Sequence, residues 1–322
     1  MSTTLPRSAG QAKQLRETVG LAAMLKGPDQ LPTPPDGEAF RTRFAPSPTG
    51  YLHIGHAYAA LFARETAHAS GGKFLLRVED IDGHRCRPEF EDAIYKDLNW
   101  MELYWDGTPW RQSDRMAIYE AALKELDALG VIYPCFCSRK QIRAQIEEAG
   151  QAPHGVHDEM IYPGICRNLD AKERESRMSR GQAYALRLDV AKAAAKVGQL
   201  FWQDFRGGLI EARPQILGDA VIARKDTPTS YHLAVTIDDY MQEINLVTRG
   251  EDLFEVTHVH RLLQALLGIK TPYYYHHNLL ADKTGARLSK RNRAITLRNL
   301  RDNRKTPDQI WDMLGLQEHV AA

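Results

Sequence analysis

Hydrophobic and polar positions alternate along this chain in two periods, one typical of strands and the other typical of helices. Apolar strand-like runs precede amphipathic stretches of helical length, and this alternation predicts βα units with a parallel sheet. The predicted elements are, in chain order, a helix from about 57 that stops at 70–72, a strand at 74–82, helices at 88–101 and 114–129, a strand at 219–225, a helix at 231–239, a strand at 244–248, a helix at 256–267 and a strand at 273–280. We expect Ser113 or Asp114 to cap the helix at 114–129.

The pattern changes between residues 131 and 210, where short strands, loops and three of the four cysteines are predicted. This change indicates a subdomain inserted into the sheet. We therefore expect an α/β fold, with a doubly wound parallel (Rossmann-like) nucleotide-binding sheet and an inserted α+β subdomain. The predicted boundaries are a poorly ordered N-terminal extension at 1–40, the first half of the Rossmann-like domain at 41–130, the insertion at 131–210, the second half at 211–296 and short C-terminal helices at 297–322.

Composition places the chain among ordinary globular proteins. Its 322 residues are 43% hydrophobic, which is enough for a substantial core. Apolar runs stay well below the roughly 20 residues of a membrane span, and the N-terminus does not resemble a secretory signal, so we expect a cytoplasmic protein. The net charge of +1 carries no sign of nucleic-acid binding, but residues 287–305 hold eight Lys or Arg and one acidic residue. That segment either attracts a phosphate backbone or forms a solvated helix face.

The segment from Arg43 to His56 combines an extended, proline-punctuated strand end with a glycine turn and a His-x-x-His pair. Its prolines disfavour helix before the turn, while Gly50 and Gly55 allow a backbone to come close to a ligand. Good helix formers follow, so His53 and His56 should project where the first turn of a helix attracts anions. The segment predicts phosphate binding. A zinc pair or two surface histidines are the alternatives for an isolated His-x-x-His.

The whole segment resembles the nucleotide-binding signature of class I aminoacyl-tRNA synthetases, and the run at 43–47 resembles their glutamyl branch. A second signature, at 287–291, is similar to the mobile lysine loop of that family. This lysine loop departs from the family pattern because Arg287, Leu288 and Arg291 stand where Lys, Met and Ser are usual. The resemblance implies ATP as substrate with Mg²⁺, bound by His53, Gly55, His56 and Lys290, of which the two histidines and Lys290 are catalytic.

Glutamate recognition makes a specific demand on charge. The substrate carries one ammonium and two carboxylates, so its site needs an anion and two cationic groups. The resemblance implies that Glu79 binds the α-ammonium, that Arg249 with Tyr231 binds the side-chain carboxylate and that Arg43 lies near the α-carboxylate. The full implied set is Arg43, Phe44, Ala45, Pro46, Ser47, Glu79, Tyr231 and Arg249. The alternative for Arg249 is a surface salt bridge with a neighbouring acidic residue, Glu251 or Asp252.

Three cysteines form a Cys-x-Cys-x24-Tyr-x3-Cys pattern with one tyrosine: Cys135, Cys137, Tyr162 and Cys166. Three thiolates and one oxygen or nitrogen would complete a tetrahedral Zn²⁺ site. The pattern resembles the zinc-binding insertion of glutamyl-queuosine tRNA synthetases, which implies Tyr162 as the fourth ligand. Replacement of Tyr162 by His154 or His157, or three reduced and buried cysteines without a metal, are the alternatives. Cys86 lies outside the pattern.

Residues 291–322 follow the lysine loop, and we expect two short helices there, around 298 and at 307–314, with no anticodon-binding domain. Shortened relatives with this order of motifs are glutamyl-queuosine tRNA(Asp) synthetases. That resemblance implies a monomer that activates L-glutamate with ATP and transfers it to the cyclopentenediol of queuosine in the anticodon loop of tRNA(Asp). The alternatives are a truncated glutamyl-tRNA synthetase that charges tRNA(Glu) and a catalytically silent tRNA-binding paralogue. A nucleotidylyltransferase would explain the histidine turn but not the two arginines or the lysine loop.

Overall fold

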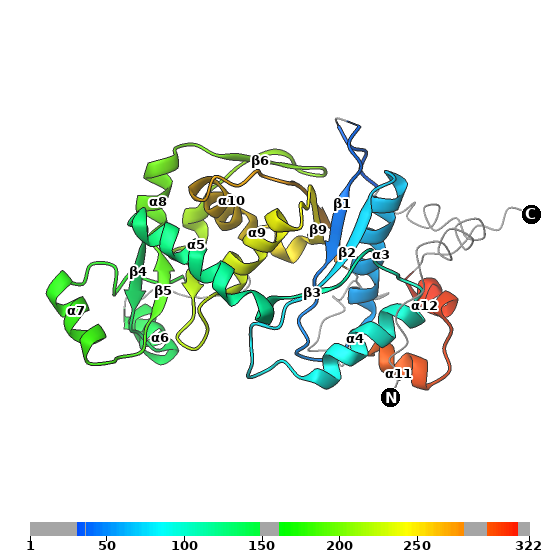
Figure 1. Cartoon of the computed structure of the whole chain (residues 1–322), viewed down its shortest axis with the longest axis horizontal. Coiled ribbons are helices and arrows are strands. Elements are labelled where there is room, and N and C mark those ends of the chain that lie inside the picture. Colours follow the sequence, from blue (N-terminus) through cyan, green and yellow to red (C-terminus); the bar gives the residue numbers. More distant parts are fainter. Residues whose placement is uncertain (1–30, 36, 149–160, 280–294, 315–322) are drawn as a thin grey trace, which may run out of the picture. The chain divides into compact units, whose positions relative to one another are not determined.

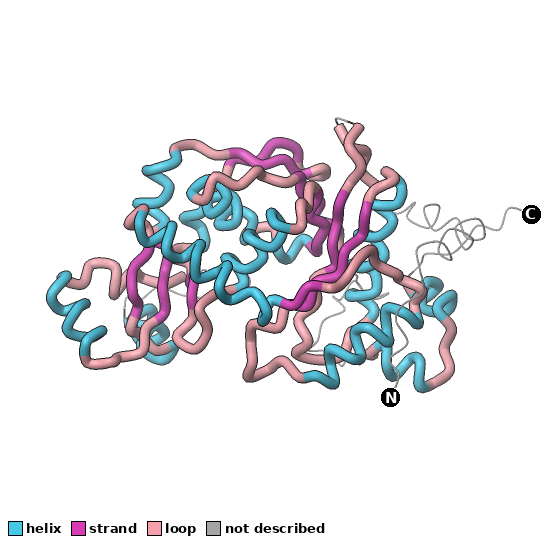
Figure 2. Tube along the Cα trace, viewed as in Figure 1, coloured by secondary structure: helices cyan, strands magenta, loops and turns pink. Residues whose placement is uncertain are grey.

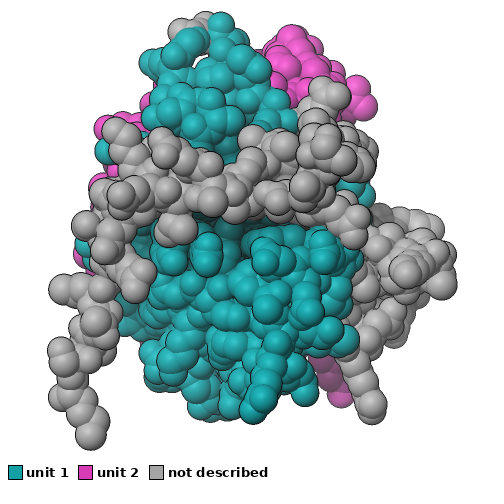
Figure 3. Space-filling view, turned by 90° about the vertical axis from the view of Figure 1, so that its right-hand side faces the viewer, with its two compact units in different colours: residues 1–111, 245–251, 275–322 teal, residues 112–244, 252–274 magenta. Residues whose placement is uncertain are grey.

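The computed structural model describes residues 31–35, 37–148, 161–279 and 295–314. The chain forms two compact units (Figure 3), of which the first comprises residues 1–111, 245–251 and 275–322 and the second residues 112–244 and 252–274. Three predicted features lie outside the described residues: most of the extension at 1–40, the pair His154 and His157, and the lysine loop with Lys290. Within the described ranges, no helix is long and apolar enough to cross a membrane.

The first unit is built on a parallel βαβ arrangement (Figure 1). β1 (Arg41–Phe44) and β2 (Lys73–Val78) are parallel, and α3 (Ile54–Ala69) connects them and packs against both strands. The register pairs Arg41 with Lys73, Thr42 with Phe74, Arg43 with Leu75 and Phe44 with Leu76. β3 (Trp110–Arg111) extends the sheet on the other side of β2, again in parallel. The predicted parallel α/β arrangement is therefore confirmed in this unit.

The end of α3 lies where the sequence predicts it. Ser70 is the C-cap, and its hydroxyl accepts the Phe40 N–H at 2.8 Å. Gly71 then takes φ +73°, a conformation that favours glycine. At Gly72 an added Cβ would lie 1.8 Å from the Phe40 carbonyl oxygen. Two glycines in succession thus allow the chain to turn and to enter β2 directly beside the residue that precedes β1.

Other helices and one further strand complete the first unit. α4 (Pro88–Trp100) begins with Pro88, as predicted, and β9 (Leu246–Gly250) packs beside β1. The two short C-terminal helices are also confirmed as α11 (Leu297–Asp302) and α12 (Pro307–Met313). α11 packs against α4, where the Arg301 guanidinium binds the buried Asp97 carboxylate.

The second unit contains an antiparallel three-stranded sheet. Its strands are β4 (Ile132–Cys135), β5 (Ala185–Leu188) and β8 (Val221–Ala223), in the order β4-β5-β8. The strand predicted at 219–225 was wrong in its placement, because β8 pairs antiparallel with β5 instead of continuing a parallel sheet. Apolar periodicity identifies a strand, but it does not identify the neighbouring strand.

The described part of the range 131–210 contains three helices besides its short strands, which is in line with the expected α+β insertion, although none of these helices was predicted individually: α6 (Arg139–Glu148), α7 (Ala171–Ser179) and α8 (Val190–Val197). Two of them have a recognisable start signal. Asp170 accepts the Lys172 N–H at 3.0 Å, and Asp189 accepts the Lys192 N–H at 3.1 Å. Aspartate is a preferred N-cap, so these two helix starts were visible in the sequence.

The second unit contains further helices and strands, drawn in cyan and magenta in Figure 2. They include the 3₁₀ turn η1 (Gln112–Arg115), α5 (Met116–Ala128), β6 (Phe201–Asp204), β7 (Gly208–Glu211), α9 (Tyr231–Met241) and α10 (Val256–Leu266). β10 (Tyr273–His277) begins in this unit, where Tyr274 pairs with Asp204, and its last three residues belong to the first unit.

The predicted cap of α5 was wrong. Its N-cap is Arg115, while Ser113 and Asp114 lie in the preceding 3₁₀ turn. The buried Asp238 carboxylate accounts for this start, because it accepts Arg115 Nε at 2.7 Å and Gln112 Nε2 at 3.0 Å. A partner more than 100 residues away thus sets where α5 begins.

Candidate functional site

His53 and His56 lie at the start of α3, and each ring takes part in capping the helix. His53 is the N-cap, and its Nδ1 accepts the Gly55 N–H at 3.1 Å. His56 Nδ1 accepts the His53 backbone N–H, also at 3.1 Å, and the two ring centroids lie 3.8 Å apart. Because each Nδ1 accepts, a neutral ring carries its proton on Nε2. The turn therefore combines two imidazole Nε2–H donors with the N-terminal end of a helix, which suits an anion.

Two arginines are buried on neighbouring strands of the same unit. Arg43 on β1 and Arg249 on β9 are each 6% exposed, and Arg43 Nη1 donates to the Thr248 carbonyl oxygen at 3.1 Å. Arg249 Nε donates to His276 Nε2 at 3.1 Å. The Arg249 guanidinium is therefore held inside the first unit and not on its surface. A pair of buried guanidinium groups concentrates positive charge, as a dicarboxylate ligand requires.

The predicted proline–serine run meets Glu79 at the end of β2. Ser47 Oγ donates to the Glu79 carbonyl oxygen at 3.1 Å, and the Glu79 N–H donates to the Pro46 carbonyl oxygen at 3.0 Å. The Glu79 carboxylate accepts Arg77 Nη2 at 3.2 Å. The bonds of Glu79 with Ser47 and Pro46 connect residues 32 and 33 positions apart in sequence, so the structure brings together two of the predicted substrate-binding segments.

Sequence reasoning missed two residues that orient this site. Arg77 is fully buried beside Glu79, and its signal was a charged residue inside an otherwise apolar strand. His276 is the buried partner of Arg249 and is one of two adjacent histidines near the end of β10. Tyr231 begins α9 in the second unit, where its ring lies 5.5 Å from those of His232 and of His260.

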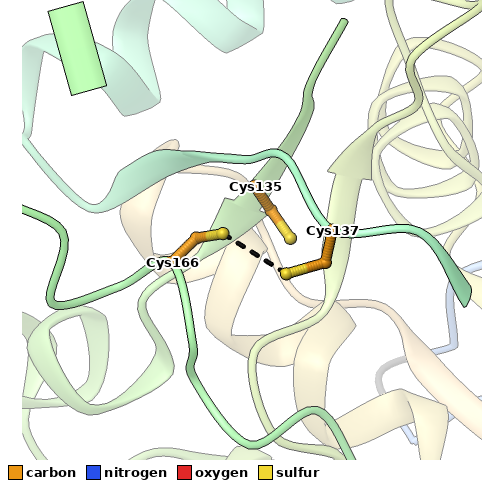
Figure 4. Close-up of side chains that lie close together, drawn as sticks. All are labelled: Cys135, Cys137 and Cys166. Atoms are coloured by element: carbon orange, nitrogen blue, oxygen red, sulfur yellow. Dashed lines mark hydrogen bonds between the residues drawn. The ribbon is translucent and has the colours of Figure 1, made fainter. Parts of the chain in front are cut away.

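The three predicted cysteines come together in the second unit, with their thiols pointing toward one another (Figure 4). All three sulfur atoms of Cys135, Cys137 and Cys166 lie within 4.8 Å of one another, and the Cys137 and Cys166 sulfurs are 3.4 Å apart. The Tyr162 hydroxyl oxygen lies 3.4 Å from the Cys135 sulfur and 3.8 Å from the Cys137 sulfur. Among the described residues, these three cysteines form the group of three or more His, Cys, Asp or Glu side chains that could hold a metal ion.

The geometry of these four residues fits Zn²⁺. Sulfur atoms bound at about 2.3 Å around a tetrahedral ion lie slightly under 4 Å apart, close to the spacing in this cluster. Burial raises the pKa of Cys137 to about 12. Burial would also raise the pKa of Cys166, but hydrogen bonds from the Phe136 N–H, Tyr162 and Cys137 outweigh it and lower that pKa. A buried group of thiols can become thiolate together only with a compensating cation, so reduced cysteines without a metal remain the alternative.

Comparisons with known proteins identify the family of this chain. Residues 39–317 match the family of tRNA synthetases class I (E and Q), catalytic domain. The glutamyl-Q tRNA(Asp) synthetase of Rhodobacter capsulatus is 45% identical over 284 residues, which cover 85% of this chain and 99% of that protein. The glutamate–tRNA ligase of Coprothermobacter proteolyticus is 37% identical over 281 residues, 87% of this chain and 59% of that protein.

A solved structure is similar as well. The glutamate tRNA ligase from Elizabethkingia meningosepticum in complex with its amino acid superposes with a TM-score of 0.68 at 30% identity, covering 79% of this chain and 52% of that one. The resemblance inferred from the motifs and the Rossmann-type α/β fold are thus confirmed. The chain belongs to the class I tRNA synthetases of the glutamyl and glutaminyl group, a family of ligases.

Proposed function

We propose that this protein activates L-glutamate with ATP to glutamyl-adenylate and transfers the glutamate to the cyclopentenediol of queuosine in the anticodon loop of tRNA(Asp). One structural observation carries the glutamate part of the proposal, the buried pair Arg43 and Arg249 on strands β1 and β9. Similarity over 99% of the glutamyl-Q tRNA(Asp) synthetase of Rhodobacter capsulatus supports the acceptor.

Amino-acid activation needs positive charge and positioning more than it needs a base. The glutamate carboxylate attacks the α-phosphorus of ATP, and pyrophosphate leaves with the bonding electron pair. His53 and His56 would donate Nε2–H bonds to the phosphates from the start of α3. Lys290, in the lysine loop, would stabilise the charge that develops on the transferred phosphorus. Mg²⁺ would arrive with ATP, because it is commonly held by phosphates and water with few protein ligands.

The charges in the first unit support the proposed binding of the amino acid. Glu79 would bind the α-ammonium group, because a carboxylate is the natural partner of a cation. Arg249 would bind the side-chain carboxylate, and Arg43 would lie near the α-carboxylate. Arg77 and His276 hold Glu79 and Arg249 in place through the bonds at 3.2 and 3.1 Å. Aspartate, one methylene shorter, would not bridge the same groups.

The proposed transfer step resembles ordinary aminoacylation in its chemistry. A hydroxyl of a cis-diol attacks the acyl-adenylate, the ester bond forms and AMP leaves, without a covalent enzyme intermediate. In ordinary aminoacylation the diol belongs to the terminal ribose, whereas here it belongs to the queuosine base. The proposal therefore changes the acceptor and not the reaction class.

We further propose that Cys135, Cys137, Tyr162 and Cys166 hold Zn²⁺. The ion would tie β4 to the segment around Tyr162, which follows Cys137 after 24 intervening residues. When bound, Zn²⁺ supplies structural cross-linking of the two segments, since all four positions are filled by the protein. Elemental analysis of freshly purified protein, prepared without chelator, tests this proposal. Less than half an equivalent of zinc would argue against the site.

The function is tested with purified protein, radiolabelled glutamate, ATP and three RNAs: tRNA(Asp) with queuosine, tRNA(Asp) without it and tRNA(Glu). We expect label only on tRNA(Asp) that carries queuosine. Label on tRNA(Glu) alone would instead support charging by a truncated glutamyl-tRNA synthetase. Glutamate-dependent pyrophosphate exchange separates both enzymes from a silent tRNA-binding paralogue, which would catalyse no exchange.

A further inference from the structure

The cysteine cluster, defined as Cys135, Cys137, Tyr162 and Cys166, is surrounded by polar groups from β5 and from the residues that precede β8. We propose that Asp219 and Arg187 are positioning residues of this metal centre, which hold the two ligand-bearing segments in the geometry that Zn²⁺ requires. The inference rests on the proposed zinc site and extends it to residues outside the ligand pattern. Neither residue belongs to the Cys-x-Cys-x24-Tyr-x3-Cys sequence.

Asp219 connects the two ligand-bearing segments through one buried carboxylate. Its Oδ2 accepts the Tyr133 hydroxyl at 2.5 Å and Arg167 Nη1 at 3.1 Å. Tyr133 lies two residues before Cys135 on β4, and Arg167 directly follows Cys166. Both bonds are therefore made within two residues of a cysteine, one on each segment. The side chain of Asp219 is 3% exposed, so water competes little for these bonds.

A third segment also binds the Asp219 carboxylate, and the chain just before Asp219 passes close to Ile161. Its Oδ1 accepts the Val190 N–H at 3.1 Å, which anchors it to the start of α8. The preceding residue, Gly218, has φ +61°, and an added Cβ there would lie 2.8 Å from Ile161 Cγ2. Gly218 thus allows the chain to pass close to the residue before Tyr162. A carboxylate fixed in this way can hold Tyr133 and Arg167 without moving itself.

Arg187 holds the tyrosine ring. Its guanidinium carbon lies 3.8 Å from the Tyr162 ring centroid, and its Nη1 donates to the Asp219 carbonyl oxygen at 2.6 Å. The hydroxyl of the same tyrosine is held separately, because its oxygen accepts the Cys166 N–H at 2.8 Å. A planar guanidinium stacked on the ring restricts its rotation, and the hydrogen bond to Asp219 fixes the guanidinium.

Charge supports the same assignment. Three thiolates around one Zn²⁺ carry a net negative charge, and burying that charge is unfavourable unless cations lie near it. Cations from four separate segments surround the cluster. Besides Arg167 and Arg187, Lys225 Nζ donates to the Phe136 carbonyl oxygen at 2.9 Å, and the Arg177 guanidinium carbon lies 5.6 Å from the Phe136 ring centroid. Outer-shell partners of this kind commonly change metal affinity 10- to 100-fold.

The test compares full-length wild-type protein with Asp219→Asn, Arg187→Met and Arg187→Lys. The control is Arg180→Met, which removes one positive charge from an exposed position at the end of α7. Zinc transfer to a chromogenic chelator gives the rate of metal release, and the absorption bands of the Co²⁺-substituted proteins report the ligand geometry. We expect Asp219→Asn and Arg187→Met to release zinc about 10- to 100-fold faster and to change the Co²⁺ bands. Arg187→Lys should be intermediate, and the control should match wild type.

Each other outcome has a defined meaning. Wild type that binds neither zinc nor Co²⁺ overturns the zinc proposal and the positioning roles together. Wild type that binds zinc, with unchanged release and unchanged Co²⁺ bands in Asp219→Asn and Arg187→Met, overturns the positioning roles alone. Release from Arg187→Lys at the wild-type rate would reduce the role of Arg187 to charge and overturn its role in orienting the ring. If Asp219→Asn does not fold, as judged by circular dichroism, the two Arg187 variants decide the question.

Discussion

His53 and His56 form a capping box at the start of α3. His56 Nδ1 accepts the His53 N–H at 3.1 Å, and the His53 side chain accepts N–H groups of the first turn. Both bonds use the Nδ1 nitrogen of the ring. They leave neutral rings protonated on Nε2, the state that donates to an anion. Helix capping and the proposed phosphate binding are thus two uses of the same two side chains.

The dual role of His53 can be separated by substitution. Asparagine is a good N-cap but has no imidazole, so His53→Asn should keep the stability of the protein while glutamate-dependent pyrophosphate exchange falls at least about tenfold. His53→Ala should lose both the exchange and about 1 kcal/mol of unfolding free energy. Chemical denaturation and pyrophosphate exchange measure the two effects. Equal stability of the two variants would contradict the capping role.

Recognition of the glutamate side chain should depend on the planar shape of Arg249. Lysine keeps the charge but loses the Nε–H bond to His276 and the paired donors of the guanidinium. We expect Arg249→Lys to raise the KM for glutamate at least about tenfold with a smaller change in the KM for ATP. Lys96→Arg, an opposite exchange at an exposed position of α4, is the matched control. Unchanged glutamate KM in Arg249→Lys would remove Arg249 from the substrate site.

The charge of Lys290 is predicted from the sequence to act only during activation. Lys290→Ala should lower the rate of pyrophosphate exchange at least tenfold, or about 1.4 kcal/mol of transition-state stabilisation, with little change in glutamate affinity. Lys290→Arg is the charge-preserving control. Exchange at the wild-type rate in Lys290→Ala would refute this role.

Asp97 should make stability depend on pH. Burial, only partly offset by Arg301, raises the pKa of its carboxyl to about 6. The folded state therefore binds the proton more tightly than the unfolded state, whose pKa is about 4. The contribution of Asp97 to the unfolding free energy is fully present below pH 4 and is lost as pH rises through 6, by about 3 kcal/mol at most.

Asp97→Asn should remove this dependence. Denaturation of wild type and of the variant at several values between pH 4 and pH 7.5 gives the difference in unfolding free energy. The unfolding free energy of wild type minus that of the variant should fall as pH rises. Half of this fall should be complete below about pH 6. A difference that does not change with pH would mean that Asp97 has the same pKa in both states.

Gly71 and Gly72 should respond differently to alanine. At Gly71 the cost is backbone strain, because φ is +73° and nothing lies within 4 Å of an added Cβ. At Gly72 an added Cβ would overlap the Phe40 carbonyl oxygen at 1.8 Å, and the backbone would have to move. We expect Gly71→Ala to lose about 1 kcal/mol of unfolding free energy and Gly72→Ala clearly more. A smaller loss at Gly72 would contradict the close approach to Phe40.

Sequence signals predicted the ends of helices well where residues of the same segment determine them. The end of α3 at Ser70 and the start of α4 at Pro88 depend on caps and on glycine or proline, all within a few residues. The cap of α5 was missed, because Asp238 draws Gln112 and Arg115 toward itself from another helix. His276 was missed for the same reason, since its partner Arg249 lies on another strand. Arg77 was missed although its partner Glu79 is only two residues away, because the packing around β2 decides that its side chain is buried.

The order of the motifs was sufficient to identify the family, and the spacing of the cysteines was sufficient to predict that three thiols meet. Both predictions were possible because a motif is defined by the types of its residues and by their separation in sequence. Tertiary structure decided the rest. It determined that β8 joins β5, that Arg249 is buried against His276 and that Asp219 ties the two halves of the cysteine cluster together. These relationships join residues distant in sequence, and only the packing of the folded chain selects such partners.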